Sequence, residues 1–360
     1  MGQTKSGSRT SFMACAAAVV TLSVVTHSFG KTDVPVFLLS GQSNMAGYCF
    51  SESGLSAEDK EDVDNVKIYI EGDGAQNKKG KWLTLGMKFD AMGMTLGPEL
   101  SFGRTLSDSM PDTKIALIKS SVGGTYLGKS EDWLPPSSNN GNGGRLYNNM
   151  MGHIDAALRS FNSAFDTSLY VPQWAGFVWF QGEFDAYDLQ YANVYEQNLT
   201  NLINDIREHV EVDDLPVIIP MIDVQSQWTH NGVVRTADIT VSQNMENVDT
   251  VDTKGLPTDG THYRADGYIT IGKRCAERWL AMDFDYGEKV PVVHFSGSAG
   301  VRGNSLDFYA PAVTVFDLAG RRIGSCEGNA LLGSAPLQLR TNGCAVTVRG
   351  RFAGSYCNVR

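Results

Sequence analysis

Cysteine is scarce in this sequence, and no cysteine stands in a metal-binding pattern. Six cysteines occur among 360 residues, and none has C-x-x-C or zinc-like spacing. Three of them, Cys326, Cys344 and Cys357, lie in the last 35 residues. If the chain is exported, these three favour a disulfide, although the sequence does not define the pairing. We expect no metal site and no cofactor built on cysteine.

Basic residues are also in deficit. The chain has 30 lysines and arginines against 40 acidic residues, a net charge of −10. Lys5 and Arg9 are the only charged residues among the first thirty, so the remaining chain carries −12. A strongly acidic protein is a poor partner for nucleic acid or an anionic membrane surface, because like charges repel. The charge balance therefore indicates a neutral ligand.

Long apolar runs are absent except at the start of the chain. Residues 12–26 form one run of about 15 residues, which is too short for a confident membrane span. Lys5 and Arg9 precede it, and small residues around Ser28 and Gly30 follow it, which is typical of a cleaved signal peptide. We predict that residues 1–30 are a signal peptide, that the protein is secreted or displayed on the cell surface, and that no membrane span remains.

Composition changes sharply near residue 290. Residues 31–289 contain 21 basic and 37 acidic residues, whereas residues 290–360 contain 7 and 3. The later segment has no lysine and no tryptophan but ten glycines, and its short apolar runs are separated by glycine-rich turns. This pattern predicts a main domain over residues 31–289 and a small all-β module over residues 290–360.

Apolar runs and amphipathic segments alternate along the main domain. Continuous apolar runs at 34–39, 115–119, 174–180 and 216–222 are typical of parallel strands covered on both faces. Helical stripes lie between them, and a further helix is expected over residues 267–282 with Asp266 as its N-cap. The alternation predicts an α/β protein, a three-layer α/β/α sandwich with a parallel sheet. Ligands bind such sheets at the carboxyl ends of the strands.

Small and polar residues gather at those predicted strand ends. They form four clusters, at residues 40–44, 120–125, 181–185 and 259–262. Alone, each has a structural explanation, because serine often caps a helix and Asp-Gly often forms a turn. Four such clusters at one edge of one sheet instead indicate a site.

The first and last clusters contain the parts of a nucleophilic centre. The Ser43 hydroxyl is a weak nucleophile that needs a general base, and His262 can serve. Asp259 can orient the histidine ring and stabilise the imidazolium. Backbone N–H groups at Gly123 and Gly124 can approach a developing oxyanion.

Together the four clusters resemble a known family. Residues 41–47, Gly-Gln-Ser-Asn-Met-Ala-Gly, resemble the first block of the SGNH hydrolases, within the carbohydrate-esterase branch that holds acetylxylan esterases (carbohydrate esterase family 6) and sialate O-acetylesterases. Residues 122–125, 179–185 and 259–262 resemble the later blocks of this branch. The resemblance spans about residues 34–282.

The resemblance implies a flavodoxin-like fold and ester hydrolysis through an acyl-serine at Ser43, without metal or organic cofactor. It implies an oxyanion hole formed by the Ser43 and Gly123 or Gly124 N–H groups and the Gln181 amide. The acid partner of the histidine in this branch is either Asp259 or Glu183. We favour Asp259 and keep Glu183 as a second acid or a substrate contact.

The C-terminal module has a resemblance of its own. Residues 313–322 and the closing residues 354–356 resemble the C-terminal sorting domains of the type IX secretion system. This resemblance implies that secretion machinery is a partner of the module. The alternative is a small stabilising or sugar-binding β-module.

The leading hypothesis is a secreted serine esterase that removes acetyl groups from a plant polysaccharide such as xylan. A sialate O-acetylesterase would use the same catalytic residues but needs a cationic pocket, for which the candidates are Arg104, Arg145, Arg235 and Arg264. A glycosidase would pair two carboxylates such as Glu183 and Asp259. A non-catalytic carbohydrate-binding surface protein would expose aromatic side chains, with Trp133 or Trp228 as candidates.

Overall fold

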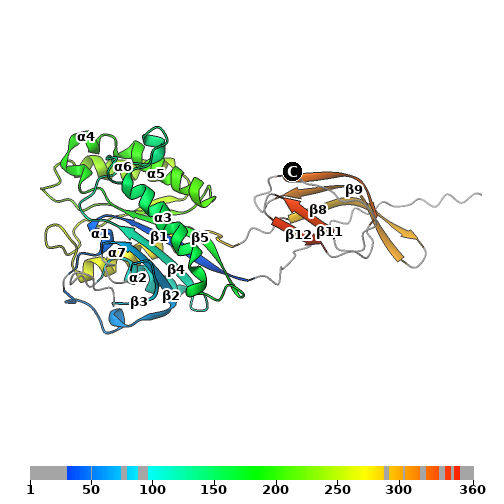
Figure 1. The fold of residues 1–360 in the computed structure, drawn as a ribbon, viewed down its shortest axis with the longest axis horizontal. Coiled ribbons are helices and arrows are strands. Elements are labelled where there is room, and N and C mark those ends of the chain that lie inside the picture. The colour runs from blue at the N-terminus through cyan, green and yellow to red at the C-terminus, as the bar shows by residue number, and fades with distance from the viewer. Residues whose placement is uncertain are drawn as a thin grey trace, which may run out of the picture. The chain divides into compact units, whose positions relative to one another are not determined.

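A computed structural model describes side chains at residues 31–49, 51–73, 79–87 and 96–287, and the backbone of five strands between residues 292 and 348. By its internal contacts the chain separates into two units, one of which is Lys31–Gly287 while the other includes Glu288–Arg360 (Figure 1). The predicted signal peptide lies outside the described residues. Among the described residues, no helix is long and apolar enough to cross a membrane.

The larger unit is built on one seven-stranded sheet. Its spatial order is β3-β2-β4-β1-β5-β6-β7, and every neighbouring pair is parallel except β2 with β3. The strands are β1 (Thr32–Gly41), β2 (Val63–Gly72), β3 (Trp82–Leu85), β4 (Ile115–Ser121), β5 (Tyr170–Phe180), β6 (Val217–Pro220) and β7 (Val248–Val251). The predicted α/β fold is confirmed, but the sheet is mixed. A short connection joins β2 to β3, and a short connection can only return the chain antiparallel.

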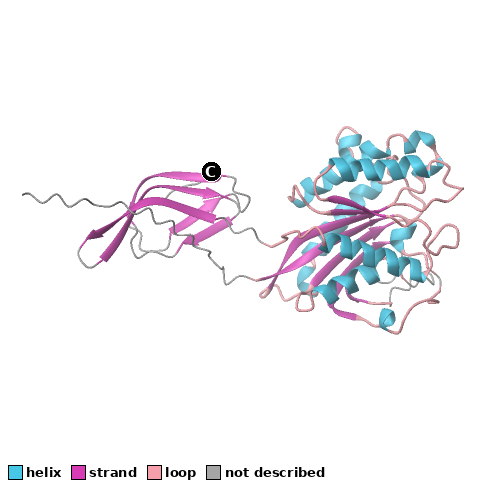
Figure 2. Ribbon diagram, turned by 180° about the vertical axis from the view of Figure 1, so that it is seen from behind, coloured by secondary structure: helices cyan, strands magenta, loops and turns pink. Residues whose placement is uncertain are grey.

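Helices cover both faces of this sheet (Figure 2). Side chains of α3 (Arg145–Arg159), α5 (Tyr195–Val210) and α6 (Asn231–Asn244) pack into one core. Those of α2 (Glu99–Ser109) and α7 (Ala265–Leu280) pack into the other. Along β1, Val36 and Leu38 enter the first core while Phe37 and Leu39 enter the second. Because both faces are buried, the strand reads as a continuous apolar run.

Several elements differ from the sequence-based prediction. The four predicted strands and the three predicted helices are present, whereas β2, β3, β7, α2, α6 and the four-residue α4 (Leu189–Ala192) were not predicted. The last helix begins at Ala265 with Arg264 as its N-cap residue. Asp266 therefore lies in the first turn, where its charge favours the positive end of the helix dipole, and not at the cap.

The smaller unit contains only strands among its described residues. Strands β8 (Val292–Arg302), β9 (Ser305–Phe316) and β10 (Arg322–Leu331) form an antiparallel sheet in the order β10-β9-β8. Strands β11 (Leu337–Thr341) and β12 (Cys344–Val348) form an antiparallel pair. The expected disulfide among the three C-terminal cysteines falls outside the described side chains.

The chain leaves β1 through a glycine that no other residue can replace without strain. Gly41 has φ +145°, and a Cβ at this position would overlap the carbonyl oxygen of Phe180 on the adjacent strand β5. The same carbonyl accepts the N–H of Gln42 at 3.1 Å. This close approach of β1 and β5 fixes the direction in which the chain enters the turn at Ser43.

We expect Gly41→Ala to lower the free energy of unfolding by about 3 kcal/mol or more, because it adds both an unfavourable φ and a steric overlap. Chemical denaturation of the variant measures the loss. Gly152→Ala is the matched control, since Gly152 lies inside α3 with nothing within 4 Å of its added Cβ. That variant should be stabilised by up to about 1 kcal/mol. Equal stability of Gly41→Ala and the parent would contradict the steric argument.

Candidate active site

One pocket is lined by residues from all four predicted clusters. It has a volume of about 320 Å³ and lies where loops follow the carboxyl ends of β1, β4 and β5. The cluster at residues 120–125 contributes one residue, Gly124, to its wall. The lining residues are Gln42, Ser43, Asn44, Tyr48, Gly124, Glu183, Phe184, Tyr187, Trp228, Thr261 and His262.

Ser43 is the first residue of a single helical turn, α1 (Ser43–Ala46). The Ala46 N–H donates to the Gln42 carbonyl at 2.8 Å, and the Gly47 N–H donates to the Ser43 carbonyl at 2.9 Å. Gly47 then ends the turn in the left-handed region at φ +90°. The Ser43 side chain keeps 8% exposure and faces the pocket. A short turn at the end of a buried strand thus presents one hydroxyl to the cavity.

A buried ion pair supports the far end of this turn. The Lys119 ammonium on β4 lies 2.7 Å from the Glu99 carboxylate, and both side chains are almost fully buried. Lys119 also donates to the Ala46 carbonyl at 3.0 Å, which is the last carbonyl of α1. Glu99 in turn accepts the Gly97 N–H at 3.2 Å. The cation therefore stabilises the carboxyl end of the turn that carries Ser43.

Glu183 joins the third cluster to the first. One carboxylate oxygen accepts the Asn44 side-chain amide at 2.5 Å, and the other accepts the Gln42 side-chain amide. Burial raises the pKa of Glu183, and the two amides oppose that rise. Asn44 is itself held by the Tyr268 hydroxyl at 2.9 Å. Glu183 thus fixes the residues on both sides of Ser43, and no hydrogen bond links it to the His262 ring within the described residues.

His262 and Asp259 share a tight turn between β7 and α7. The Asp259 N–H donates to the His262 carbonyl at 2.9 Å. The Asp259 carboxylate accepts the N–H groups of Thr261 at 2.9 Å and His262 at 2.7 Å. Burial acts to raise the pKa of Asp259, but these N–H groups outweigh it, so the pKa is lowered and the side chain is anionic. Asp259 therefore places a negative charge at the backbone of the histidine.

The serine and the histidine line the same cavity but are not bonded to each other. No hydrogen bond joins the Ser43 hydroxyl to the His262 ring, or that ring to the Asp259 carboxylate, in the part of the chain that the structure describes. The Tyr48 ring lies beside the imidazole, with 5.0 Å between centroids. Hydrogen bonds of this kind are often loose before substrate binds and tighten in the reacting complex.

The histidine environment sets a pH dependence. Burial lowers the pKa of His262 below its ordinary 6.5 because it disfavours the imidazolium, and the Asp259 charge opposes that shift. A general base must be neutral, so kcat/KM should rise with pH through a midpoint below 6.5 and be nearly constant above it. Asp259→Asn should move the midpoint to lower pH, since it removes the charge that favours the imidazolium. A midpoint above 6.5 in the parent would contradict this environment.

The predicted oxyanion donors are arranged differently from the expectation. The Gln181 amide nitrogen donates to the Thr125 carbonyl at 2.8 Å and to Asp185 at 2.7 Å, and the side chain is fully buried. Both amide hydrogens are thus committed to the protein. The Gly123 N–H donates to the Asp73 carboxylate at 2.7 Å. Gln181 therefore has a structural role in this conformation. Its amide joins the loop after β4 to the turn after β5 and donates no hydrogen bond into the pocket among the described residues.

The tryptophans and arginines considered for the alternative functions are not placed as those functions require. Trp133 and Trp228 are only 1% and 2% exposed, so neither forms an exposed aromatic platform. Trp228 instead contributes to the pocket wall. Four arginines were considered for a cationic pocket: Arg104, Arg145, Arg235 and Arg264. None of them is among the described residues that line this pocket.

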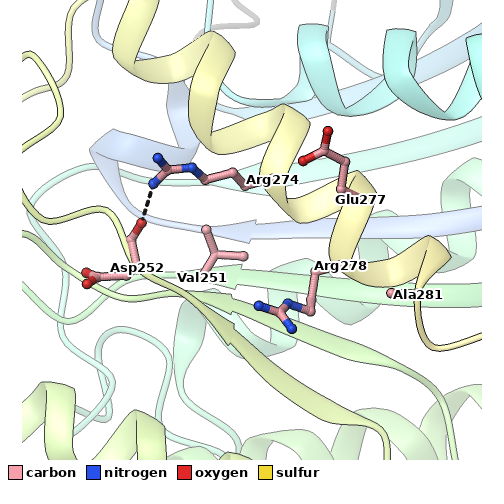
Figure 3. Close-up of a pocket in the computed structure, with 6 residues that line it drawn as sticks. All are labelled: Val251, Asp252, Arg274, Glu277, Arg278 and Ala281. Atoms are coloured by element: carbon pink, nitrogen blue, oxygen red, sulfur yellow. Dashed lines mark hydrogen bonds between the residues drawn. The ribbon is translucent and has the colours of Figure 1, made fainter.

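A second hollow lies apart from this pocket, between α7 and β7 (Figure 3). It has a volume of about 370 Å³, and its charged side chains are engaged with neighbours. Arg274 donates to the Asp252 carbonyl at 2.8 Å, and Arg278 lies 3.3 Å from Asp249. It contains no nucleophile. Across the described residues, no cluster of histidine, cysteine or acidic side chains is arranged to hold a metal ion.

The sequence-based prediction did not single out two polar residues of this region, Tyr48 and Asp73. Tyr48 follows the first block directly, and its hydroxyl donates to the Asp73 carboxylate at 2.7 Å. Asp73 immediately follows the last residue of β2. The position of an acid directly after a strand was a usable signal, but β2 itself was not predicted, so the residue was not placed at the sheet edge.

The family comparison identifies this chain as a carbohydrate esterase. The family model described as "carbohydrate esterase, sialic acid-specific acetylesterase" matches residues 33–281, well over half of the chain. The chain belongs to this family. The match confirms the resemblance to the sialate O-acetylesterase branch and assigns the domain to carbohydrate ester hydrolysis.

Individual relatives are distant. A probable carbohydrate esterase of Arabidopsis thaliana is 23% identical over 265 residues, which cover 68% of this chain and 90% of the relative. Its crystal structure superposes with a TM-score of 0.55 at 21% identity, covering 69% of this chain and 98% of the other. The structure of NanS superposes with a TM-score of 0.51 at 17% identity, covering 70% and 98%. At these identities the structural likeness supports the fold alone.

Proposed function

We propose that this esterase removes O-acetyl groups from a neutral plant polysaccharide such as xylan, through an acyl-enzyme on Ser43. The observation that carries the proposal is the pocket that Ser43 and His262 line together. No lysine or arginine is found among its described lining residues, so the carboxylate of a sialic acid would have no cationic partner there. The overall charge of −10 also favours a neutral substrate.

The proposed reaction uses three side chains. Ser43 attacks the acetyl carbonyl while His262 accepts the hydroxyl proton, and Asp259 stabilises the resulting imidazolium. His262 then gives the proton to the departing sugar hydroxyl. Water attacks the acetyl-serine with the same histidine as base, and acetate leaves. Glu183 keeps Ser43 in place through Gln42 and Asn44 and does not exchange a proton with the substrate.

The pocket wall suits a sugar ring. Phe184, Tyr187 and Trp228 present aromatic side chains beside the serine. Aromatic rings pack well against the apolar C–H faces of sugars, and polar groups around them can accept sugar hydroxyls. This wall favours a carbohydrate ester over a simple aliphatic one.

Export completes the proposal. The first thirty residues act as a signal peptide, and the C-terminal module serves the type IX secretion machinery or, alternatively, stabilises the enzyme or binds sugar. A chain placed outside the cell meets acetylated polymers directly, which agrees with the proposed substrate.

The test is acetate release by the purified protein from acetylated xylan and from O-acetylated sialic acid. We expect release from xylan with the higher kcat/KM, and no release from either substrate by Ser43→Ala. Higher kcat/KM on the sialic acid would identify the protein as a sialate O-acetylesterase with the same serine mechanism. Failure on both substrates and on a small acetyl ester would reject the esterase mechanism and favour carbohydrate binding without catalysis.

A further inference from the structure

Two hydrogen-bond donors near Ser43 converge on one oxygen. The Gly123 N–H and the Tyr48 hydroxyl both donate to the same Asp73 carboxylate oxygen, each at 2.7 Å. The donors come from different segments, the loop after β4 and the residue that follows the first block. Two donors directed at a single oxygen have the geometry of an oxyanion hole.

Both donors lie close to the side chain of the nucleophile. A side-chain carbon placed on Gly123 would be 2.6 Å from the Tyr48 hydroxyl and 3.3 Å from the Ser43 Cβ. The hydroxyl and the serine side chain therefore flank the same glycine. Tyr48 also lines the pocket, and its ring packs beside His262.

Tyr48 is suited to donate. Burial raises the pKa of its hydroxyl, and the hydrogen bond to Asp73 raises it further, so the group keeps its proton at neutral pH. The Gln181 amide, by contrast, has both hydrogens engaged away from the pocket. The Tyr48 hydroxyl is thus directed at the same oxygen as the Gly123 N–H, whereas the Gln181 amide is directed at Thr125 and Asp185.

We propose that Tyr48 is a catalytic residue, which donates to the acetyl oxygen together with the Gly123 N–H, and that Asp73 occupies this oxyanion site until substrate displaces it. The inference rests on the proposed Ser43 mechanism and deepens it. When the Ser43 oxygen bonds to the acetyl carbon, the carbonyl π pair moves onto the acetyl oxygen. The Tyr48 and Gly123 hydrogens stabilise that charge, and both stay on their own atoms.

The experiment compares Tyr48→Phe with the parent on p-nitrophenyl acetate and on acetylated xylan. The variant keeps the aromatic ring and loses only the donor, so kcat/KM should fall about 10²–10³-fold, mostly in kcat. Affinity for a boronic acid that forms a tetrahedral adduct on serine should fall in parallel. Tyr170→Phe is the control, because Tyr170 lies at the amino end of β5, away from the strand ends that form the pocket; it should match the parent.

Asp73→Ala tests the occupant. Removing the competing carboxylate should leave kcat/KM unchanged or raise it and should strengthen boronic acid binding. A fall as large as that of Tyr48→Phe would overturn the assignment of Asp73 as an occupant that substrate displaces.

Parent-like kcat/KM in Tyr48→Phe, with Ser43→Ala inactive, would overturn the role of Tyr48 while the serine mechanism stands. Activity retained by Ser43→Ala would instead reject the proposed function. Thermal melting of each variant identifies a change caused by misfolding. Even if Tyr48→Phe is unstable, boronic acid binding that is no stronger in Asp73→Ala than in the parent would overturn the assignment of Asp73.

Discussion

Ser43→Ala should lower kcat by about 10⁴-fold or more, because removal of the nucleophile leaves only binding and oxyanion stabilisation to accelerate the reaction. KM should change little, since the hydroxyl contributes mainly at the transition state. Acetate release from acetylated xylan measures the loss. Mass spectrometry of the parent, quenched during turnover of a fast acetyl ester, should show one added acetyl group that the variant lacks.

Ser163→Ala is the matched control for this substitution. Ser163 is exposed and precedes β5, and its hydroxyl donates to the nearby Ser160 carbonyl at 2.7 Å, so its loss should leave kcat at the parent value. Near-parent activity in Ser43→Ala would contradict serine catalysis and return the two-carboxylate mechanism to consideration. Both variants lose one serine hydroxyl, so a difference in kcat between them comes from the position of that hydroxyl in the structure.

Glu183→Ala should both destabilise the protein and impair it. The substitution leaves the Gln42 and Asn44 amides buried without their acceptor, which costs about 3–5 kcal/mol. For a domain of this size that corresponds to a fall in Tm of about 6–20 °C. Because Ser43 lies between the two amides, kcat should also fall, by about 10²-fold for a displacement near 1 Å. Calorimetry and steady-state kinetics measure the two effects.

Glu183→Gln separates a positioning role from a proton-accepting one. The variant keeps one acceptor oxygen and most of the shape, so it should lose less stability than Glu183→Ala. Only the Asp259 charge opposes the lowered pKa of His262. The acid limb of the pH profile should therefore stay in place in Glu183→Gln and shift in Asp259→Asn. The reverse pattern would make Glu183 the acid partner of the histidine.

The fold could be predicted where burial on both faces left an unbroken apolar run. β1, β4, β5 and β6 read in this way, and the parallel α/β architecture follows from their alternation with helices. β2 begins Val-Asp-Asn-Val and is only partly buried there, so polar residues interrupt its pattern. β7 has four residues with two partly exposed, too few to show a period. Partial burial weakened the signal that periodicity supplies.

The candidate site was predictable to the level of clusters but not of contacts. Strand ends meet at one edge of a parallel sheet, so Ser43, Glu183 and His262 could be expected in one place. The orientation of Gln181 could not, because it depends on Thr125 and Asp185, whose positions come from the loop after β4 and the turn after β5. The direction of a side chain after a strand depends on contacts with residues that are distant in the sequence.

The contact between Asp73 and the two donors beside Ser43 also bears on how the enzyme tolerates its own product. Asp73 is tethered to β2, so its carboxylate faces these donors at a high effective concentration that free acetate must exceed to bind there. In the proposed mechanism an acetyl ester gains a covalent bond to serine when it displaces Asp73, whereas acetate does not. In the proposed mechanism a tethered competitor of this kind weakens inhibition by accumulated acetate.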